Sequence, residues 1–212
     1  GETCPVNVSL IGAESAVNVG EYTAQAAITN NNYSIASGST TDFSITKARK
    51  NAPELTASAE TIFGKKDGKI NGLTTDMEYR KVTSATAGVA SDITVGEYTH
   101  VDNPNISFES GTYAVRYKEN DNYSASDDAF VTVNPGDKLT ITLPSNQGGY
   151  TISCDKTKVG WNDSVTLSFS LNRGYEKTND FAIKANGTEI TGTNENKFTV
   201  SNIQKNQIIT VS

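Results

Sequence analysis

The run Val165-Thr-Leu167-Ser-Phe169-Ser-Leu171 alternates apolar and polar side chains without a break. Successive side chains of a β-strand point to opposite faces, so this run predicts a half-buried antiparallel strand. Val165, Leu167, Phe169 and Leu171 are expected to face a core, and the Thr and Ser residues between them to face water. No long stretch of the chain has the apolar i, i+3, i+4, i+7 spacing of an amphipathic helix. We therefore expect an all-β fold.

The same alternation recurs elsewhere in the chain. It is seen in Val6-Asn-Val8-Ser-Leu10 and in Tyr113-Ala-Val115-Arg-Tyr117. The stretch 181–190 predicts a hairpin, because Asn186-Gly187 supplies the two residues of positive φ that a type I′ turn needs between twisted strands.

Two linkers rich in structure breakers separate the alternating runs, at residues 47–53 and 134–137. They predict boundaries near residues 50 and 136, and therefore three segments: 1–49, 50–135 and 136–212. Hydrophobic residues make up 35% of the chain, and the mean hydropathy is −0.44. Both values are low for one large core, because the buried fraction rises with domain size, and they favour several small modules.

An internal repeat supports the first boundary and the second. Three blocks recur in the same order, and each copy ends just before a linker. The blocks are Gly20-Glu-Tyr22, Asn32-Tyr-Ser34 and Phe43-Ser-Ile45 in the first copy, and Gly111-Thr-Tyr113, Asn122-Tyr-Ser124 and Phe130-Val131-Thr-Val133 in the second.

The Gly-x-Tyr block suggests a structural role for its tyrosine. In immunoglobulin-like sandwiches, a Tyr near the start of a late strand bonds back to the backbone a few residues upstream. Tyr22 and Tyr113 occupy that position and lie on the apolar side of their alternating runs. We expect both to make this hydrogen bond rather than to bind a ligand.

Several stretches carry a likeness to known repeats. They are Val17-Asn-Val19-Gly-Glu-Tyr22-Thr-Ala24, residues 43–48, Gly68-Lys-Ile70-Asn-Gly72, residues 77–80 and 111–116, Val159-Gly-Trp161-Asn-Asp163-Ser-Val165, and Asn172-Arg-Gly174-Tyr175. With these stretches, the first two segments resemble bacterial immunoglobulin-like repeats of Gram-positive surface proteins, including the MBG-type modules. The third resembles the β-rich repeats found near the C-termini of such proteins.

This resemblance implies tandem small immunoglobulin-like β-sandwich modules on a bacterial cell surface. Segment 1–49 would be a truncated module whose opening strands precede Gly1, as in an expressed fragment. Segment 50–135 would be an immunoglobulin- or fibronectin-like sandwich, and 136–212 a β-rich bacterial repeat.

The formal net charge is −6. An acidic surface repels phosphate backbones, so we expect no nucleic-acid partner. The short basic clusters Arg49-Lys50, Lys65-Lys66 and Arg80-Lys81 are interpreted as solvated surface. No apolar run is long enough to cross a membrane, so we expect no membrane insertion. We also expect the chain to be a monomer.

The residues that carry enzyme chemistry are sparse. His100 is the only histidine, and no Gly-x-Ser-x-Gly elbow surrounds a serine. A zinc site needs four ligands at defined spacings, which one His and the distant Cys4 and Cys154 do not supply. We therefore expect no catalytic residues, no metal and no cofactor. We expect Cys154 to be a small buried hydrophobe, and Cys4 could be a free thiol.

Two features leave ligand binding open. The acidic stretch 119–128 could wrap a calcium ion, although it lacks the EF-hand spacing, and a solvated loop is the alternative. Trp161, Tyr150 and Tyr175 are candidates for a sugar-stacking surface, with Trp161 as the candidate ligand-binding residue. Tyr150 shares its parity with Ile152, so the core is its expected place, and packing is the alternative for Trp161.

Together these features predict a non-catalytic stalk or interaction region of a bacterial surface protein, with a host or cell-wall glycan or protein as the possible ligand. The alternative is a carbohydrate-binding accessory region of a secreted glycan-active enzyme.

Overall fold

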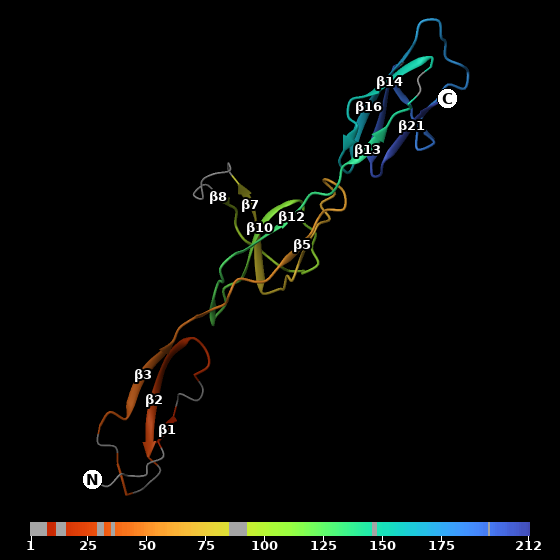
Figure 1. Ribbon diagram of the computed structural model, residues 1–212. Coiled ribbons are helices and arrows are strands. Elements are labelled where there is room, and N and C mark those ends of the chain that lie inside the picture. Colours follow the sequence, from red (N-terminus) through yellow and green to blue (C-terminus); the bar gives the residue numbers. More distant parts are fainter. Residues whose placement is uncertain are drawn as a thin grey trace.

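The computed structural model describes residues 8–11, 16–28, 32–34, 37–84, 93–145, 148–194 and 196–212. Every regular element within these ranges is a strand, which confirms the all-β expectation. No helix in the described part of the chain could span a membrane. Three groups of strands follow one another along one line from the N-terminus to the C-terminus (Figure 1).

The first group is a three-stranded antiparallel sheet of β1 (Val8–Ile11), β2 (Gly20–Ile28) and β3 (Thr40–Ile45), with β2 in the middle. Tyr22 on β2 stacks on Phe43 on β3, with ring centroids 5.5 Å apart. The expected strand from Val6 is described only from Val8 onward, and Val6 lies outside the described residues.

The middle group has a sheet of order β12-β10-β7-β8, in which β9 also pairs with β7, and a separate β5–β6 ladder. Tyr113 and Val115 on β10 are buried, as their alternation predicts, and they pack with Met77 and Val133 in one cluster. The strands are β5 (Thr56–Ser58), β6 (Lys69–Asn71), β7 (Met77–Ser84), β8 (Ile93–Val95), β9 (Thr99–His100), β10 (Gly111–Tyr117) and β12 (Ala129–Val133).

The first and third blocks of the internal repeat have matching strand registers in the two copies. Tyr22 pairs with Phe43 across β2 and β3, and Tyr113 pairs with Val131 across β10 and β12. In both copies, the glycine two residues before the tyrosine pairs with the β-branched residue that ends the partner strand. The two copies therefore share a pairing geometry as well as a sequence pattern.

The predicted tyrosine hydrogen bond is present in both copies. The Tyr22 hydroxyl donates to the carbonyl of Asn18 at 2.8 Å, and the Tyr113 hydroxyl donates to the carbonyl of Glu109 at 2.9 Å. Burial raises the pKa of Tyr113 to about 12, so its hydroxyl remains a donor at neutral pH. Each bond ties the strand to the turn that precedes it.

Replacing Tyr113 by phenylalanine is expected to lower the free energy of unfolding of the middle group by about 1 kcal/mol. The ring remains in the core while one largely buried hydrogen bond is lost. Urea denaturation measures the change, and Tyr123→Phe on a more exposed ring serves as the control. An unchanged midpoint for Tyr113→Phe would contradict this role.

The third group contains two sheets, of order β15-β13-β21-β17-β18 and β14-β16-β20-β19. Strands β13 and β21 are parallel, and the other pairs are antiparallel. The strands are β13 (Leu139–Thr142), β14 (Tyr150–Cys154), β15 (Lys158–Val159), β16 (Asp163–Leu171), β17 (Ile183–Ala185), β18 (Thr188–Glu189), β19 (Gly192–Asn194), β20 (Lys197–Ile203) and β21 (Gln207–Val211).

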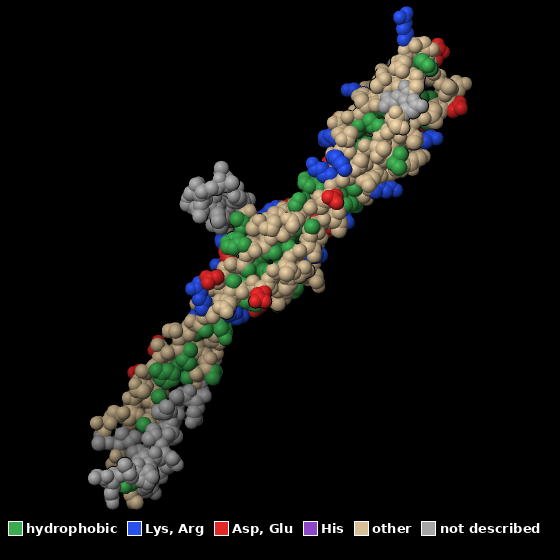
Figure 2. Space-filling model, in the orientation of Figure 1, with side chains coloured by type: hydrophobic (Ala, Val, Ile, Leu, Met, Phe, Trp, Pro, Cys, Tyr) green, Lys and Arg blue, Asp and Glu red, His purple; other side chains and the backbone are tan. Residues whose placement is uncertain are grey.

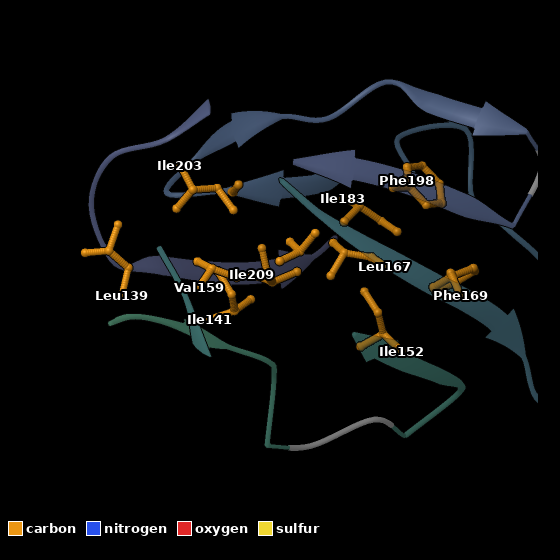
Figure 3. Packing of buried hydrophobic residues seen from close by; sticks show 12 residues of the cluster. Leu139, Ile141, Ile152, Val159, Leu167, Phe169, Ile183, Phe198, Ile203 and Ile209 are labelled. Carbon is orange, nitrogen blue, oxygen red and sulfur yellow. The ribbon is translucent and has the colours of Figure 1, made fainter. Parts of the chain in front are cut away.

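Strand β16 follows its predicted alternation except at its last residue. Val165, Leu167 and Phe169 are at most 2% exposed, and their cluster also takes residues from β17 and β21 of the other sheet (Figure 3). Leu171 is 37% exposed, so its predicted burial is wrong. Strand β20 pairs with β16 only as far as Ser168, so Leu171 has a neighbouring strand on one side only, where it pairs with Tyr150 of β14.

The predicted hairpin is confirmed. Strands β17 and β18 pair around Asn186 and Gly187, whose φ angles are 48° and 83°. These positive values match the type I′ geometry that suits the twist of the two strands.

Candidate functional site

The first two groups of strands are joined by a parallel pairing. Strand β4 (Ala48–Arg49), within the predicted linker, pairs with β11 (Tyr123–Ser124) of the middle group. Asn122 binds the first group with its side chain: its Oδ1 accepts from the Val19 amide at 2.9 Å, and its Nδ2 donates to Asn18 Oδ1 at 2.8 Å. A residue of the repeated Asn-Tyr-Ser block therefore holds the two groups together.

Opposite charges also meet at this first junction, where Lys and Arg side chains lie beside Asp and Glu (Figure 2). Lys47 pairs with Glu119, and Arg49 pairs with Asp127. Two carboxylates of the acidic stretch 119–128 thus face the basic linker. Asp128 pairs instead with Arg80, at 2.9 Å. Among the described residues, no three His, Cys, Asp or Glu side chains are grouped to hold a metal ion.

The middle and third groups meet around Phe63. Its amide donates to the Asp137 carbonyl at 3.0 Å, and its carbonyl accepts from the Trp161 amide at 2.9 Å. The Lys65 ammonium lies 5.0 Å from the centroid of the Trp161 ring system, and the Lys138 ammonium 4.9 Å from that of Phe63. The structure thus places Trp161, the candidate ligand-binding residue for which packing was the alternative, half-buried at this second junction.

A buried carboxylate organises the loop 60–67 of the second junction. Glu60 is 3% exposed. Its two oxygens accept hydrogen bonds from the amides of Gly64, Lys66 and Ser110 at 3.0, 3.0 and 3.2 Å. Its own amide donates to the carbonyl of Asn134 in the linker, at 3.0 Å. No sequence motif marks Glu60, because its partners come from three separate stretches of chain.

The same loop contains an acid-sensitive contact. Asp67 accepts from the Thr61 amide at 2.9 Å and from the Thr61 hydroxyl at 2.6 Å, and it pairs with Lys65 at 3.0 Å. The hydrogen bond from the Thr61 side chain is the main cause that lowers the Asp67 pKa from 3.8 to about 2. The charged form is therefore the one that the folded loop stabilises.

We expect this loop to loosen in acid. The stabilisation from Asp67 is complete above its unfolded pKa and is lost as the pH falls from about 4 to about 2, because protonation removes the acceptor. The Thr61 amide chemical shift should titrate with a midpoint near 2. The Asp67→Asn variant should lack this transition, and a midpoint near 3.8 in the unsubstituted chain would contradict the assignment.

The other reactive side chains lie apart from one another. His100 is on β9, with its Nε2 3.8 Å from Oδ1 of the exposed Asp102. Cys154 packs half-buried against the core of the third group, and burial raises the pKa of its thiol. Cys154 was predicted to be buried; it is only partly covered, and its thiol donates to the Lys156 carbonyl at 2.8 Å. Cys4 lies outside the described residues.

A pocket lies at the end of the third group away from the second junction. Tyr150 and Tyr175, both named from the sequence as sugar-stacking candidates, line it together. The cavity has a volume of about 180 Å³. We call it the distal pocket; its lining is Gly149, Tyr150, Phe169, Leu171, Tyr175, Glu176, Lys177, Thr178, Phe181, Val211 and Ser212.

The structure separates Trp161 from the two tyrosines. Trp161 lies two residues before the start of β16, whereas Phe169 and Leu171 at the other end of that strand line the distal pocket. A nine-residue strand spans roughly 30 Å. The three predicted aromatic residues therefore do not form one surface: two share the pocket, and the third belongs to the junction.

Comparison with protein-family models, curated proteins and solved structures gave no match for this chain. The contacts at the two junctions and the distal pocket are therefore the basis for the functional inference.

Proposed function

We propose that the chain is a non-catalytic stalk or interaction region of a bacterial cell-surface protein, an adhesin-like ectodomain. The observation that supports this proposal is that both junctions between groups of strands are held by specific hydrogen bonds. Asn122 reaches across the first, and Phe63 bonds across the second to Asp137 and Trp161. Such contacts restrict the angle between neighbouring groups, which a load-bearing spacer requires.

The proposal includes tandem immunoglobulin-like modules of the sandwich type. The hydrogen bonds of Tyr22 and Tyr113 support it, since that tyrosine contact is a hallmark of immunoglobulin-like sandwiches. In the third group, one apolar cluster takes residues from both sheets, which also fits two packed layers. The predicted divisions near residues 50 and 136 belong to the same proposal.

The roles of the charged side chains support a structural task. Glu119 and Asp127 of the acidic stretch pair with Lys47 and Arg49 across the first junction. The Glu60 carboxylate holds the loop 60–67 through its hydrogen bonds. Groups that could otherwise serve a reaction or a calcium ion are engaged in joining one part of the chain to another.

Two measurements test the proposal. Small-angle scattering of the 212-residue chain should give an elongated particle, and a compact globe would contradict a stalk. Antibodies raised against the chain should label intact source cells, and mild trypsin treatment of those cells should remove the signal. Labelling that appears only after the cells are permeabilised would exclude a surface location.

The second candidate function is a carbohydrate-binding accessory region of a secreted glycan-active enzyme. Tyr150 and Tyr175 both line the distal pocket, which favours a carbohydrate-binding function over a stalk without ligands. A glycan array with the unsubstituted chain and Trp161→Ala tests the site expected from the sequence. Because Trp161 lies at the second junction, we expect the substitution to leave any glycan binding unchanged.

A further inference from the structure

We propose that the distal pocket binds a single pyranose ring, with Tyr175 as the stacking platform. This ligand site goes beyond the stalk function, which needs no ligand at this end of the chain. The proposal rests on three features of the pocket: an exposed aromatic ring, an aromatic floor, and a polar rim.

Tyr175 is exposed, with 57% of its surface accessible, and it lines the pocket. The Tyr175 amide donates to the Asn172 carbonyl at 3.1 Å, and the Asn172 amide donates to the Gly149 carbonyl at 3.0 Å, so the backbone that carries the ring is hydrogen-bonded. A Cβ on Gly149 would lie 2.6 Å from the Tyr175 ring, so the glycine lets the ring lie against the backbone.

The floor of the pocket is a cluster of aromatic rings. Phe169 is 2% exposed; its ring lies 5.6 Å from that of Tyr150 in a stacked pair and 4.9 Å from that of Phe181. These rings form the apolar base beneath the exposed Tyr175, whose negative face can attract the positively polarised C–H groups that cover one face of a pyranose.

The rim supplies groups that match sugar hydroxyls. Glu176, Lys177 and Thr178 follow Tyr175 in sequence and line the same pocket. They offer a carboxylate acceptor, an ammonium donor and a hydroxyl that does both. The Lys177 ammonium lies over the aromatic floor, 4.8 Å from the centroid of the Phe181 ring and 5.7 Å from that of Phe169. A purely apolar ligand would leave these groups without new partners.

The size of the cavity limits the ligand. Its volume of about 180 Å³ is smaller than the roughly 300–1,000 Å³ typical of pockets for drug-sized molecules. One sugar ring at the end of a glycan fits this limit better than a long oligosaccharide or a folded partner. The affinity expected from one stacked ring and a few exposed hydrogen bonds is in the millimolar range, about 4 kcal/mol.

Saturation-transfer NMR with the methyl pyranosides of glucose, galactose, mannose and N-acetylglucosamine tests the proposal on the whole chain. We expect transfer to the ring protons of at least one sugar, and shifts of the amides of residues 149–150 and 175–178. Tyr175→Ala should weaken binding about tenfold or more, and Tyr175→Phe should retain most of it because the stacking face remains. Phe130→Ala, at a ring 62% exposed in the middle group, is the matched control and should change nothing.

Three results would overturn the proposal. They are no transfer to any of the four sugars, binding that survives Tyr175→Ala in a folded variant, and binding that Phe130→Ala abolishes equally. Amide spectra of each variant establish that it is folded. None of these results bears on the particle shape or cell-surface labelling, so the stalk function can stand if the pocket fails.

Discussion

Replacing Glu60 by alanine is expected to lower the free energy of unfolding of the middle group of strands by about 3 kcal/mol or more. The carboxylate is buried and accepts hydrogen bonds from three backbone amides, those of Gly64, Lys66 and Ser110. Alanine leaves these donors without their acceptor, and a buried group left unsatisfied costs roughly 1–3 kcal/mol. The expected loss is about 3 kcal/mol rather than the full sum for three donors, because water can hydrogen-bond to those amides that lie near the loop surface.

The comparison with Glu60→Gln separates charge from hydrogen-bond geometry. Glutamine keeps one acceptor oxygen but turns an NH₂ group toward a backbone donor, so we expect a loss close to that of alanine. Glu54→Gln changes an exposed carboxylate in the same group and is the control. Thermal and urea unfolding measure all three variants. A loss within about 0.5 kcal/mol for Glu60→Ala, the range of ordinary surface substitutions, would show that the carboxylate does not hold the loop.

Several features of the fold were predictable because they depend on residues close together in sequence. The alternation that ends at Phe169 buries one face of β16, and Asn186-Gly187 makes a turn whose φ requirements are local. The hydrogen bonds of Tyr22 and Tyr113 span only four residues each. In these cases the strand period or the turn chemistry alone defines the geometry.

Contacts between distant parts of the chain were not predictable in the same way. The error at Leu171 arose because the alternation does not show that the neighbouring strand β20 ends before this position. Trp161 lies beside a turn glycine, and the sequence does not show that residues 63 and 65 would reach it. Sequence spacing likewise gives no sign that Glu60 and Ser110 meet.

The candidate pocket was partly predictable. Tyr150 and Tyr175 were identified as ring-binding candidates from residue type, and the structure brings them together. Tyr150, whose parity predicted the core, does stack on the buried Phe169 and is partly covered. The separation of Trp161 from this pair depends on the length and direction of β16, which residue types do not reveal.

Gly136 in the second linker is also expected to be sensitive to substitution, for a steric reason. The sequence presents it as a breaker after Pro135, but the structure shows a close approach of two backbones. A Cβ at position 136 would lie 2.5 Å from the Glu60 carbonyl oxygen and 2.6 Å from the Ile62 amide nitrogen. Both are backbone atoms and cannot rotate away, so Gly136→Ala must push the linker off the loop 60–67.

This displacement should weaken the junction more than it weakens either core. The hydrogen bond from Phe63 to Asp137 and the bridge between Ile62 and Asp137 both depend on the close approach. Overpacking of this kind costs about 1–3 kcal/mol. We expect NMR relaxation to show the third group of strands tumbling more independently of the middle group in Gly136→Ala. Gly148→Ala is the matched control, since its added Cβ meets no atom within 4 Å. If the middle and third groups tumble as one body in both variants, as in the unsubstituted chain, the second junction is not held by this contact. The proposal of a semi-rigid stalk would then lose its main evidence.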